Sequence, residues 1–289
     1  MKQPTLEIII VTYNSQFWLE KTLSTLHTHY LTKTKNKVIV TVVDNNSSDD
    51  TKKMLERSFP WVTPLYLEKN YGFAYANNRA LERSTTRYCM LLNSDIECTP
   101  ESTIDTLIAY MDAHPQVGVI TPKIVYSSGE LDMACHRGEP TPWASLTYFM
   151  GASKLLPHSR LFAQYHQSYK NYHSIHAIDA CSGAALLVRQ SAIKKVGLLD
   201  EQFFMYAEDL DWCTRIREAG YEIVYNPEVV VVHHKYKSGI KSSSKKLATT
   251  TRKHFYHTML QYYDKHYKDS YPSFIRTMIQ YFVRSKEGI

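Results

Sequence analysis

The fold is decided by the stretch Tyr88-Cys89-Met90-Leu91-Leu92-Asn93-Ser94-Asp95, in which an apolar run passes directly into a polar triplet. This pattern is typical of a buried strand that ends at a site. Because Leu91 and Leu92 are adjacent and both apolar, we expect both faces of the strand to be covered, as in a parallel sheet with helices on each side. Such sheets bind ligands outside the carboxyl ends of their strands.

The polar triplet at the end of this strand has the chemistry of a metal site. Asn93 and Asp95 stand two residues apart, so their side chains fall on one side of an extended chain. A carboxylate beside an amide carbonyl suits Mg²⁺ or Mn²⁺, which prefer oxygen ligands and share them with phosphates. The alternative is a local turn in which Asn or Asp only closes the strand.

Two earlier strands deliver polar residues to the same edge. The run 6–11 ends in Thr12-Tyr13-Asn14-Ser15, and the run 38–43 ends in the cluster 44–50. The helical pattern between them completes a βαβ unit. A third polar loop, Asn70-Tyr71-Gly72-Phe73, precedes a further helix. No GxGxxG or Walker sequence follows these strands. We therefore predict a nucleotide-sized site at this edge, outside the dinucleotide-binding and P-loop classes.

Length and composition bound the class of protein. The chain has 289 residues, 44% of them hydrophobic and 21% charged, as in a soluble globular protein with one large α/β domain or two small ones. Five cysteines without CxxC spacing favour a reducing compartment. We expect neither a signal peptide nor a membrane span, for which about 20 apolar residues are needed.

The middle of the chain contains a long irregular segment. After a predicted helix over 102–113 and a strand over 117–120, residues 126–176 lose periodicity, which predicts a functional excursion or an acceptor lid. Order returns at Ser182-Gly183-Ala184, where small residues before an apolar strand suggest close packing against backbone.

Three carboxylates, Glu208, Asp209 and Asp211, cluster at the start of a helix that we expect to end near residue 220. Negative charge in a first helical turn is favourable in itself. The alternative is that one of them projects into the site as a general base. Two predicted short strands follow, over 221–225 and 229–232, and the second ends at His233-His234, where histidine could act at the same edge.

The C-terminal segment is basic. From His233 onward there are twelve Lys or Arg against three Asp or Glu, while the whole chain has a net charge of +6. This balance suggests that the segment binds a polyanionic partner, either a lipid surface or nucleic acid. Helices are expected over 249–266 and 274–284, with aromatic and apolar residues among the charges. Such a segment could lie on an anionic membrane, pack on the body of the protein or contact a second subunit.

Taken together, these motifs resemble a family 2 glycosyltransferase of the GT-A fold, and most closely its bacterial rhamnosyltransferase branch. The resemblance covers about residues 6–238 and predicts an α/β architecture with a mixed, mostly parallel sheet flanked by helices. It divides the chain into a domain over 1–238 and a helical tail over 239–289. The motifs in the order of the family are 11–14, 43–47, 70–74, Asn93-Ser94-Asp95, Gly183-Ala184, Ala207-Glu208-Asp209 and Val232-His233-His234.

The resemblance also implies a role for each residue that matches a motif. It implies a donor site that consists of Thr12, Tyr13, Asn14, Asp44, Asn46, Asn70, Gly72, Phe73, Asn77, Asn93 and Ser94. It implies an acceptor site that consists of Ser182, Gly183, Ala184 and Trp212. Asp95 would bind the divalent cation with His233, although His234 is an alternative ligand. Asp209 would be the catalytic base, with Glu208 as its support and Asp211 as a solvated or capping charge.

One departure concerns Asn93, which stands where the broad family has Asp. We interpret it as a marker of the rhamnosyltransferase branch that weakens metal affinity by removing a charge. The implied activity is inverting transfer of L-rhamnose from dTDP-L-rhamnose to a glycan or polyprenyl-linked glycan of a bacterial surface polysaccharide. The enzyme would be cytoplasmic, at the inner face of the plasma membrane, as a monomer or homodimer without nucleic acid.

Three alternatives remain open. The first is a transferase of the same fold that uses a UDP- or GDP-sugar. The second is a nucleotidyltransferase, although the loop 12–15 lacks the Gly and Lys that hold a triphosphate. The third is a non-catalytic module that binds nucleotide or glycan.

Overall fold

A computed structural model describes residues 4–235 and 245–287, and the side chains within 4–235 and 255–285. The strands are β1 (Leu6–Thr12), β2 (Val38–Asp44), β3 (Thr63–Tyr66), β4 (Tyr88–Asn93), β5 (Ile96–Cys98), β6 (Val117–Tyr126), β7 (His176–Ile178), β8 (Ala185–Arg189) and β9 (Glu222–His233). In the described part of the chain they form one sheet in the order β3-β2-β1-β4-β8-β6-β9-β5, with β7 paired to β9.

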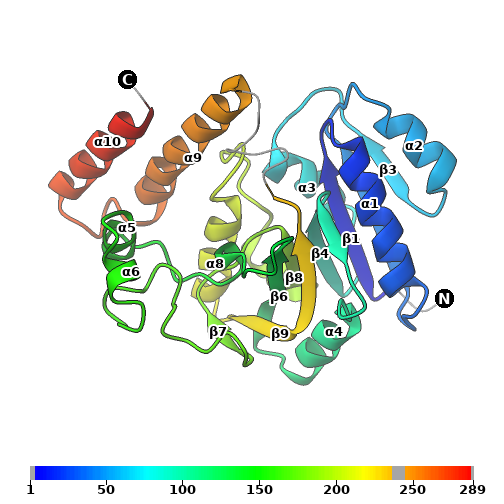
Figure 1. Cartoon of the computed structure of the whole chain (residues 1–289), viewed down its shortest axis with the longest axis horizontal. Helices are drawn as coiled ribbons and strands as arrows, with labels where there is room; N and C mark the ends of the chain where they lie inside the picture. Colours follow the sequence, from blue (N-terminus) through cyan, green and yellow to red (C-terminus); the bar gives the residue numbers. More distant parts are fainter. Residues whose placement is uncertain (1–3, 236–244, 288–289) are drawn as a thin grey trace.

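Helices cover this sheet, and their arrangement separates two ends of the molecule. The helical segments are α1 (Gln16–Leu26), η1 (His27–Leu31), α2 (Thr51–Ser58), α3 (Phe73–Leu81), α4 (Ile104–Ala113), η2 (Met133–Cys135), α5 (Pro142–Phe149), α6 (Ala152–Leu155), α7 (Gln190–Val196), α8 (Glu208–Glu218), α9 (Lys245–His266) and α10 (Ser273–Glu287). Figure 1 shows α1 and α2 at one end, and α5, α6, α9 and α10 at the other.

The strands β2, β1 and β4 confirm the prediction made from Leu91 and Leu92. They run parallel, and their apolar side chains are almost completely buried because helices cover both faces. In the observed register Thr12 lies opposite Asp44, and Val11 lies opposite Asn93. The polar ends of three strands therefore meet at one edge of the sheet, as predicted.

The predicted mixed sheet is confirmed, with parallel pairing confined to two regions. The order β3-β2-β1-β4 and the pair β6–β9 are parallel, whereas β8, β5 and β7 pair antiparallel. The strand predicted over 117–120 continues to Tyr126. The two short strands predicted over 221–232 form the single strand β9, which bends at an irregularity opposite Pro122 and Lys123. Pairing with β6 holds it together where local sequence predicts a break.

The irregular segment 126–176 contains α5 and α6, which the sequence pattern did not predict. The reason is that several apolar side chains of α5 are not in a core: Trp143 and Leu146 are 41% and 42% exposed. Helix periodicity is visible in a sequence only when one face is apolar and the other polar. Apart from the short η2 and isolated bridges at Leu131 and Arg137, the rest of the segment up to β7 is turn and loop.

The C-terminal helices pack on the body of the protein. Tyr262 and Tyr263 of α9 are each 3% exposed, and Tyr267 just beyond it is 9% exposed. Of the three interpretations of this segment, packing on the body is thus observed for α9, while contact with a membrane or a second subunit stays a prediction. The predicted boundary between 238 and 239 lies outside the described residues.

Two further observations concern the environment of the protein. Among the described residues, no helix has the length and apolar character needed to cross a membrane. The five cysteines are all buried as free thiols.

Candidate active site

A cavity of about 1280 Å³ opens at the edge where the carboxyl ends of β1 and β4 meet. It is lined by most of the predicted site residues, which come from loops more than 200 residues apart. These are Thr12, Tyr13, Asn14, Asn70, Gly72, Phe73, Asn93, Ser94, Asp95, Ser182, Gly183, Ala184, Glu208, Asp209 and His233. The structure thus brings together the predicted donor, acceptor, metal and catalytic groups in one cavity.

The loop after β1 is held in place by the loop after β2. The backbone N–H of Asn14 donates to Ser47 Oγ at 2.9 Å, and Asn14 Oδ1 accepts from the N–H of Ser48 at 2.7 Å. The N–H of Gln16 donates to Asp49 Oδ2 at 3.0 Å, so a carboxylate from another loop satisfies a free N–H of α1. This cross-linking fixes Tyr13, which is 48% exposed at the cavity.

Asn45 organises the next wall of the cavity, although the sequence analysis did not select it. Its amide donates to Asn70 Oδ1 at 2.9 Å and to the carbonyl of Gly72 at 3.1 Å, and its Oδ1 accepts from the N–H of Tyr71. Gly72 has φ +91°, and a Cβ there would lie 2.3 Å from the carbonyl oxygen of Phe204. Only glycine therefore fits at this position.

The predicted metal ligands Asp95 and His233 contact each other at the wall of the cavity. Asp95 Oδ1 lies 3.2 Å from His233 Nε2, and His233 Nδ1 lies 3.0 Å from Asp132 Oδ2. Burial lowers the pKa of His233, but its contacts with Asp132 and Asp95 outweigh burial and raise it. Lys235 adds a positive charge 3.2 Å from Asp132 Oδ2.

His234 points away from the cavity, because successive side chains of an extended chain point to opposite faces. Its Nε2 lies 2.6 Å from Glu97 Oε2, and its ring stacks on Trp18 at 4.7 Å between centroids. Of the two histidines left open by the sequence, the geometry therefore favours His233 as the partner of Asp95.

A strained turn places the two adjacent carboxylates. Tyr206 and Ala207 both have left-handed backbones, with φ of 72° and 66°, which is uncommon for residues other than glycine. They lead directly into α8, so Glu208 and Asp209 occupy the first turn of this helix. Asp209 Oδ2 accepts from the N–H of Gly183 at 3.1 Å.

Glu208 and Asp209 differ in their surroundings. Glu208 is 6% exposed, and its Oε2 has no hydrogen-bond partner among the described residues. Burial raises the pKa of Glu208 well above its usual range, and the neighbouring charge of Asp209 raises it further. This environment favours the protonated form of Glu208. Asp209 differs in that its Oδ2 is hydrogen-bonded to the backbone N–H of Gly183 at the cavity wall.

Two predictions about the rest of α8 are wrong. Asp211 is not a solvated charge: it is fully buried, and it contacts Arg215, Lys265 and His266 at 2.6 to 2.8 Å. Trp212 cannot bind an acceptor, because it is fully buried and its indole N–H donates to the carbonyl of Gly197. Asp211 faces α9, whereas Trp212 faces the residue that follows α7.

Three predicted donor residues do not line the cavity. Asp44 is 4% exposed and accepts from the N–H of Ser47 below the loop. Asn77 is 1% exposed and donates to the carbonyl of Phe73 within α3. Asn46 has a left-handed backbone, with φ 68°, and is exposed to solvent. The sequence identified loops that line the cavity, but it did not show which side chain of each loop faces inward.

No sequence pattern singled out Arg137 or the apolar side chains of α5, α9 and α10, which line the cavity, or Asp132, which is buried behind His233. All of them lie in segments without strong periodicity or motif. The Asp132–His233 pair spans 101 residues, so no local pattern could reveal it.

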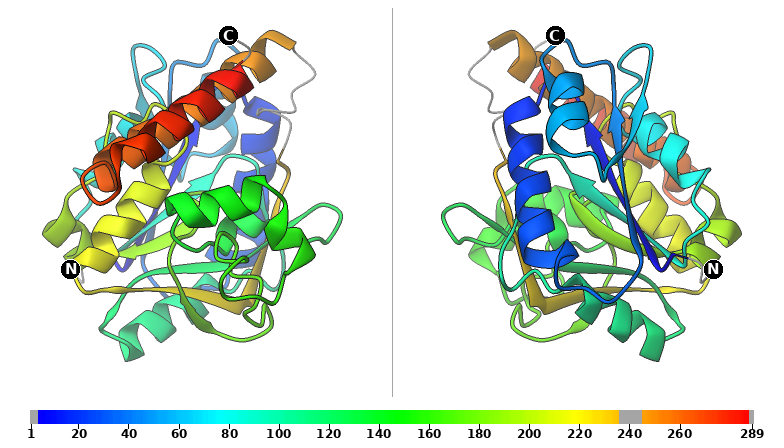
Figure 2. Two further views of the ribbon diagram at one scale, coloured as in Figure 1. Left: turned by 90° about the vertical axis from the view of Figure 1, so that its left-hand side faces the viewer. Right: turned by 90° about the vertical axis from the view of Figure 1, so that its right-hand side faces the viewer.

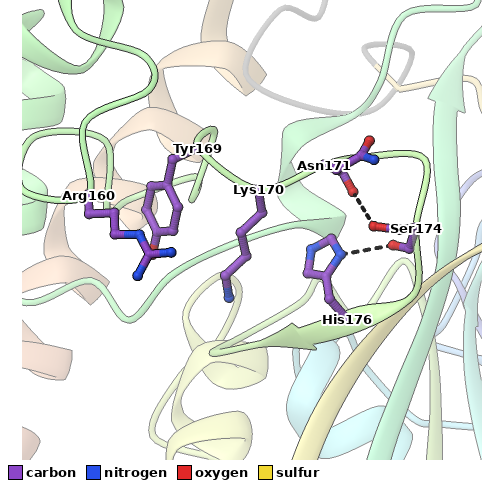
Figure 3. A pocket seen from close by; sticks show the side chains of 6 residues that line it. All are labelled: Arg160, Tyr169, Lys170, Asn171, Ser174 and His176. Atoms are coloured by element: carbon purple, nitrogen blue, oxygen red, sulfur yellow. Dashed lines mark hydrogen bonds between the residues drawn. The ribbon is translucent and has the colours of Figure 1, made fainter.

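A second, smaller cavity of about 410 Å³ lies near β7 and is lined by Arg160, Tyr169, Lys170, Asn171, Ser174 and His176. Figure 3 shows these side chains, with His176 Nδ1 bonded to the carbonyl of Ser174. Lys170 already donates to the carbonyl of Ala177 at 2.7 Å. No carboxylate lines this cavity among the described residues, and it shares none of the lining of the larger one.

Comparison with known families gives a match over most of the sheet. The family model described as "Glycosyl transferase family 2" matches residues 7–196. The matched region contains Asp95 and the loops after β1 and β2, whereas α8 and His233 lie beyond it.

Individual relatives extend the likeness to most of the chain. The N-acetylglucosaminyl-diphospho-decaprenol L-rhamnosyltransferase of Mycobacterium tuberculosis is 29% identical over 254 residues, which is 84% of this chain and 80% of the relative. A low-salt glycan biosynthesis hexosyltransferase of Haloferax volcanii is 23% identical over 79% of this chain and 67% of the relative.

Among solved structures, the mannosyltransferase PcManGT from Pyrobaculum calidifontis in complex with GDP-Man and Mn²⁺ superposes with a TM-score of 0.60 at 17% identity. The match covers 98% of this chain and 70% of that chain. It shows a common GT-A fold.

Proposed function

Because the chain belongs to glycosyl transferase family 2, we propose that this glycosyltransferase moves L-rhamnose from dTDP-L-rhamnose to a lipid-linked glycan, with inversion at the anomeric carbon. One observation carries the proposal: Asp95 and His233 on one side, and Asp209 on the other, line a single cavity large enough for donor and acceptor together. The rhamnosyl donor is supported by the relative from Mycobacterium tuberculosis.

The nucleotide of the donor is assigned to the loops after β1 and β2 and the loop before α3. Tyr13 offers an exposed ring on which a base can stack. The Asn45–Asn70 network holds the Asn70–Gly72 loop in a single conformation, so the pocket is largely formed before the donor arrives.

The chemistry of Asp95 and His233 fits a divalent cation. Their ligand atoms lie 3.2 Å apart, and Asp132 orients His233 from behind, as carboxylates commonly do for metal-binding histidines. No group of three His, Cys, Asp or Glu that could hold a metal occurs among the described residues. Two protein ligands leave positions for diphosphate oxygens and water, as is usual for Mg²⁺. A cation bound there offsets negative charge on the leaving diphosphate.

Asp209 is assigned as the base. Its carboxylate takes the proton of the acceptor hydroxyl while the oxygen forms a bond to the anomeric carbon of the sugar. The bond from that carbon to the phosphate oxygen breaks, and the nucleoside diphosphate leaves with the electron pair. Such proton transfer typically contributes about 10²- to 10⁴-fold in rate. A single displacement from the opposite face inverts the configuration.

The proposal places the enzyme in the cytoplasm, peripheral to the inner face of the plasma membrane. The five free thiols agree with a reducing compartment.

The test is a donor panel. Purified protein is incubated with dTDP-L-rhamnose and with UDP- and GDP-sugars, and released nucleoside diphosphate is measured with and without acceptor. We expect dTDP-L-rhamnose to be turned over fastest, and only with acceptor present. Preference for a UDP- or GDP-sugar would overturn the rhamnosyl donor.

The metal is tested separately. EDTA should abolish transfer, and added Mg²⁺ or Mn²⁺ should restore it. Asp95→Asn should reduce kcat at least about 100-fold, because it removes the charged ligand. Undiminished transfer in EDTA would exclude the metal role of Asp95 and His233.

A further inference from the structure

The large cavity has an apolar arm that the donor does not need. Away from the carboxylates its wall consists of side chains such as Trp143 and Leu146 of α5, Met259 of α9, and Ile279 and Phe282 of α10. The rings of Phe149 and Phe282 meet at 4.9 Å, which joins α5 to α10. At about 1280 Å³ the whole cavity exceeds the range of roughly 300–1,000 Å³ typical of a site for one small molecule.

Arg137 lines the cavity where this arm meets the catalytic end. Its electrostatic neighbours are Tyr148 and Tyr165 beside α5, and Asp209 and Asp132 at the catalytic end. The buried Nε of Arg137 has no hydrogen-bond partner, and within the described part of the chain its guanidinium forms no ion pair. An unpaired cation in a partly apolar cavity is costly unless an anion binds to it. This points to an anionic ligand group.

Exposed apolar side chains lie on the helices that line the arm and on the neighbouring α6. Leu155 of α6 is 83% exposed, Met150 between α5 and α6 is 74% exposed, and Met278 of α10 is 55% exposed. Residues 142–160 and 273–286 contain no Asp or Glu. Figure 2 (left) shows α5, α6 and α10 on the same side of the molecule, whereas α1 lies on the opposite side (right). We call Met150, Leu155 and Met278 the apolar rim.

We propose that the apolar arm binds the hydrocarbon chain of a lipid diphosphate, with Arg137 holding a phosphate at its inner end. This inference rests on the proposed function, in which that lipid is the carrier of the acceptor. Three features argue for one such occupant. The arm is continuous with the cavity that contains Asp209, the inner end presents a guanidinium whose Nε has no hydrogen-bond partner, and the helices around the outer end carry no acidic side chains over 142–160 and 273–286. A long-chain diphosphate satisfies all three at once.

The experiment measures binding of farnesyl diphosphate by isothermal titration to the full chain, with the donor site filled by Mg²⁺ and dTDP. Farnesol and inorganic diphosphate are the comparison ligands. We expect farnesyl diphosphate to bind at least about tenfold more tightly than either, because only it engages both Arg137 and the arm. Equal binding of inorganic diphosphate, or binding of farnesyl diphosphate only when dTDP is left out, would overturn the proposal.

Variants assign the two ends of the site. Arg137→Gln should weaken the binding of farnesyl diphosphate about tenfold or more and leave the binding of farnesol unchanged. Leu146→Glu should weaken the binding of both farnesyl diphosphate and farnesol. Because the Leu146 side chain is 42% exposed, this variant should fold even if the Arg137 variant does not. Phe17→Glu, at a 69% exposed position of α1 outside the cavity, is the matched control and should change neither. Native affinity in both site variants would refute the assignment.

The outcomes separate this inference from the proposed function. Suppose that dTDP-L-rhamnose is not the donor, but farnesyl diphosphate still binds beside dTDP and its binding depends on Arg137. The lipid site is then supported and the rhamnosyl donor is contradicted. If rhamnose is transferred to a soluble acceptor but farnesyl diphosphate does not bind, only the lipid site is contradicted and the proposed function is kept.

Discussion

At the scale of single residues, Glu208 and Asp209 show how two adjacent carboxylates can have different roles. Glu208 is buried without a partner for its Oε2, and burial raises its pKa well above the usual range. Asp209 lies at the cavity and accepts from the N–H of Gly183. A Cβ on Gly183 would lie 3.8 Å from Asp209 Cβ and 3.2 Å from the ring of Phe73, so this position favours a residue without a side chain.

Substitutions of Asp209 and of Glu208 are expected to affect the rate differently. Asp209→Asn should lower kcat by about 10²- to 10⁴-fold with little change in donor affinity, because it removes a proton acceptor needed only in the transition state. Glu208→Gln should change kcat only a few-fold, since Gln is close in shape to the neutral acid that burial maintains. Steady-state kinetics and nucleotide titrations measure both. A severe loss in Glu208→Gln with native rates in Asp209→Asn would reverse the assignment.

At the scale of elements, Asp211 connects α8 to α9. It is fully buried, and its Oδ1 contacts Lys265 at 2.6 Å and His266 at 2.8 Å, while Oδ2 contacts Arg215 of its own helix. Burial opposes the charge, but the hydrogen bonds from His266 and Lys265 outweigh burial and lower the pKa of Asp211 to about 2. The same helices also meet where Thr214 Oγ1 lies 2.7 Å from the Tyr262 hydroxyl.

Removing this carboxylate should destabilise the protein. Asp211→Asn leaves Arg215, Lys265 and His266 without their charged partner, and we expect it to lower the free energy of unfolding by about 3 kcal/mol and the melting temperature by roughly 10 °C. Asp264→Asn is the matched control: Asp264 pairs with a partly exposed Arg276 of α10 and should cost less than about 1 kcal/mol. Thermal and urea unfolding measure both; equal losses would show that Asp211 does not anchor α9.

The stability conferred by Asp211 should depend on pH. Because its folded pKa is depressed, its contribution is complete above the ordinary value near 4 and is lost as pH falls from about 4 to 2. The depression corresponds to about 2 kcal/mol. The difference in stability between the native protein and Asp211→Asn should therefore shrink over this range, as followed by urea unfolding at each pH. A difference that is constant between pH 5 and 2 would contradict it.

At the scale of the whole molecule, the cavity lies between two ends of different character. One wall is formed by the carboxyl ends of β1 and β4, and the other by α5 and the C-terminal helices. The apolar rim lies on the side of α5, α6 and α10 (Figure 2), where the exposed basic residues are Lys154, Arg160 and Arg284. A lipid entering the apolar arm would come from this side.

This arrangement predicts where the molecule meets a membrane. The double variant Leu155→Glu/Met278→Glu should reduce sedimentation with vesicles of equal parts phosphatidylcholine and phosphatidylglycerol about tenfold, because it replaces apolar anchors by charges that the anionic lipid repels. Phe17→Glu on α1 should behave as the native protein. An equal loss in Phe17→Glu, or native binding of the double variant, would place the contact elsewhere.

The sequence by itself determined the sheet edge and the groups gathered there. Buried apolar runs that end in polar clusters predict parallel strands whose carboxyl ends meet, and the register of Thr12, Asp44 and Asn93 agrees. Local patterns also identified loops that line the cavity, the carboxylates of α8 and the histidines at the end of β9, because each motif is short and lies at the end of a strand or the start of a helix.

Only the tertiary structure decided which of these side chains face the cavity. His233 and Asp209 face it, whereas Trp212 is buried and His234 turns toward Glu97. Side-chain direction at the end of an element depends on bends and on partners far away in sequence, such as Asp132 for His233. The apolar arm also depends on tertiary structure, because α5 and α10 line it with residues that are neither core nor surface. Periodicity in the sequence records burial in a core, and a half-exposed wall of a cavity leaves no such period.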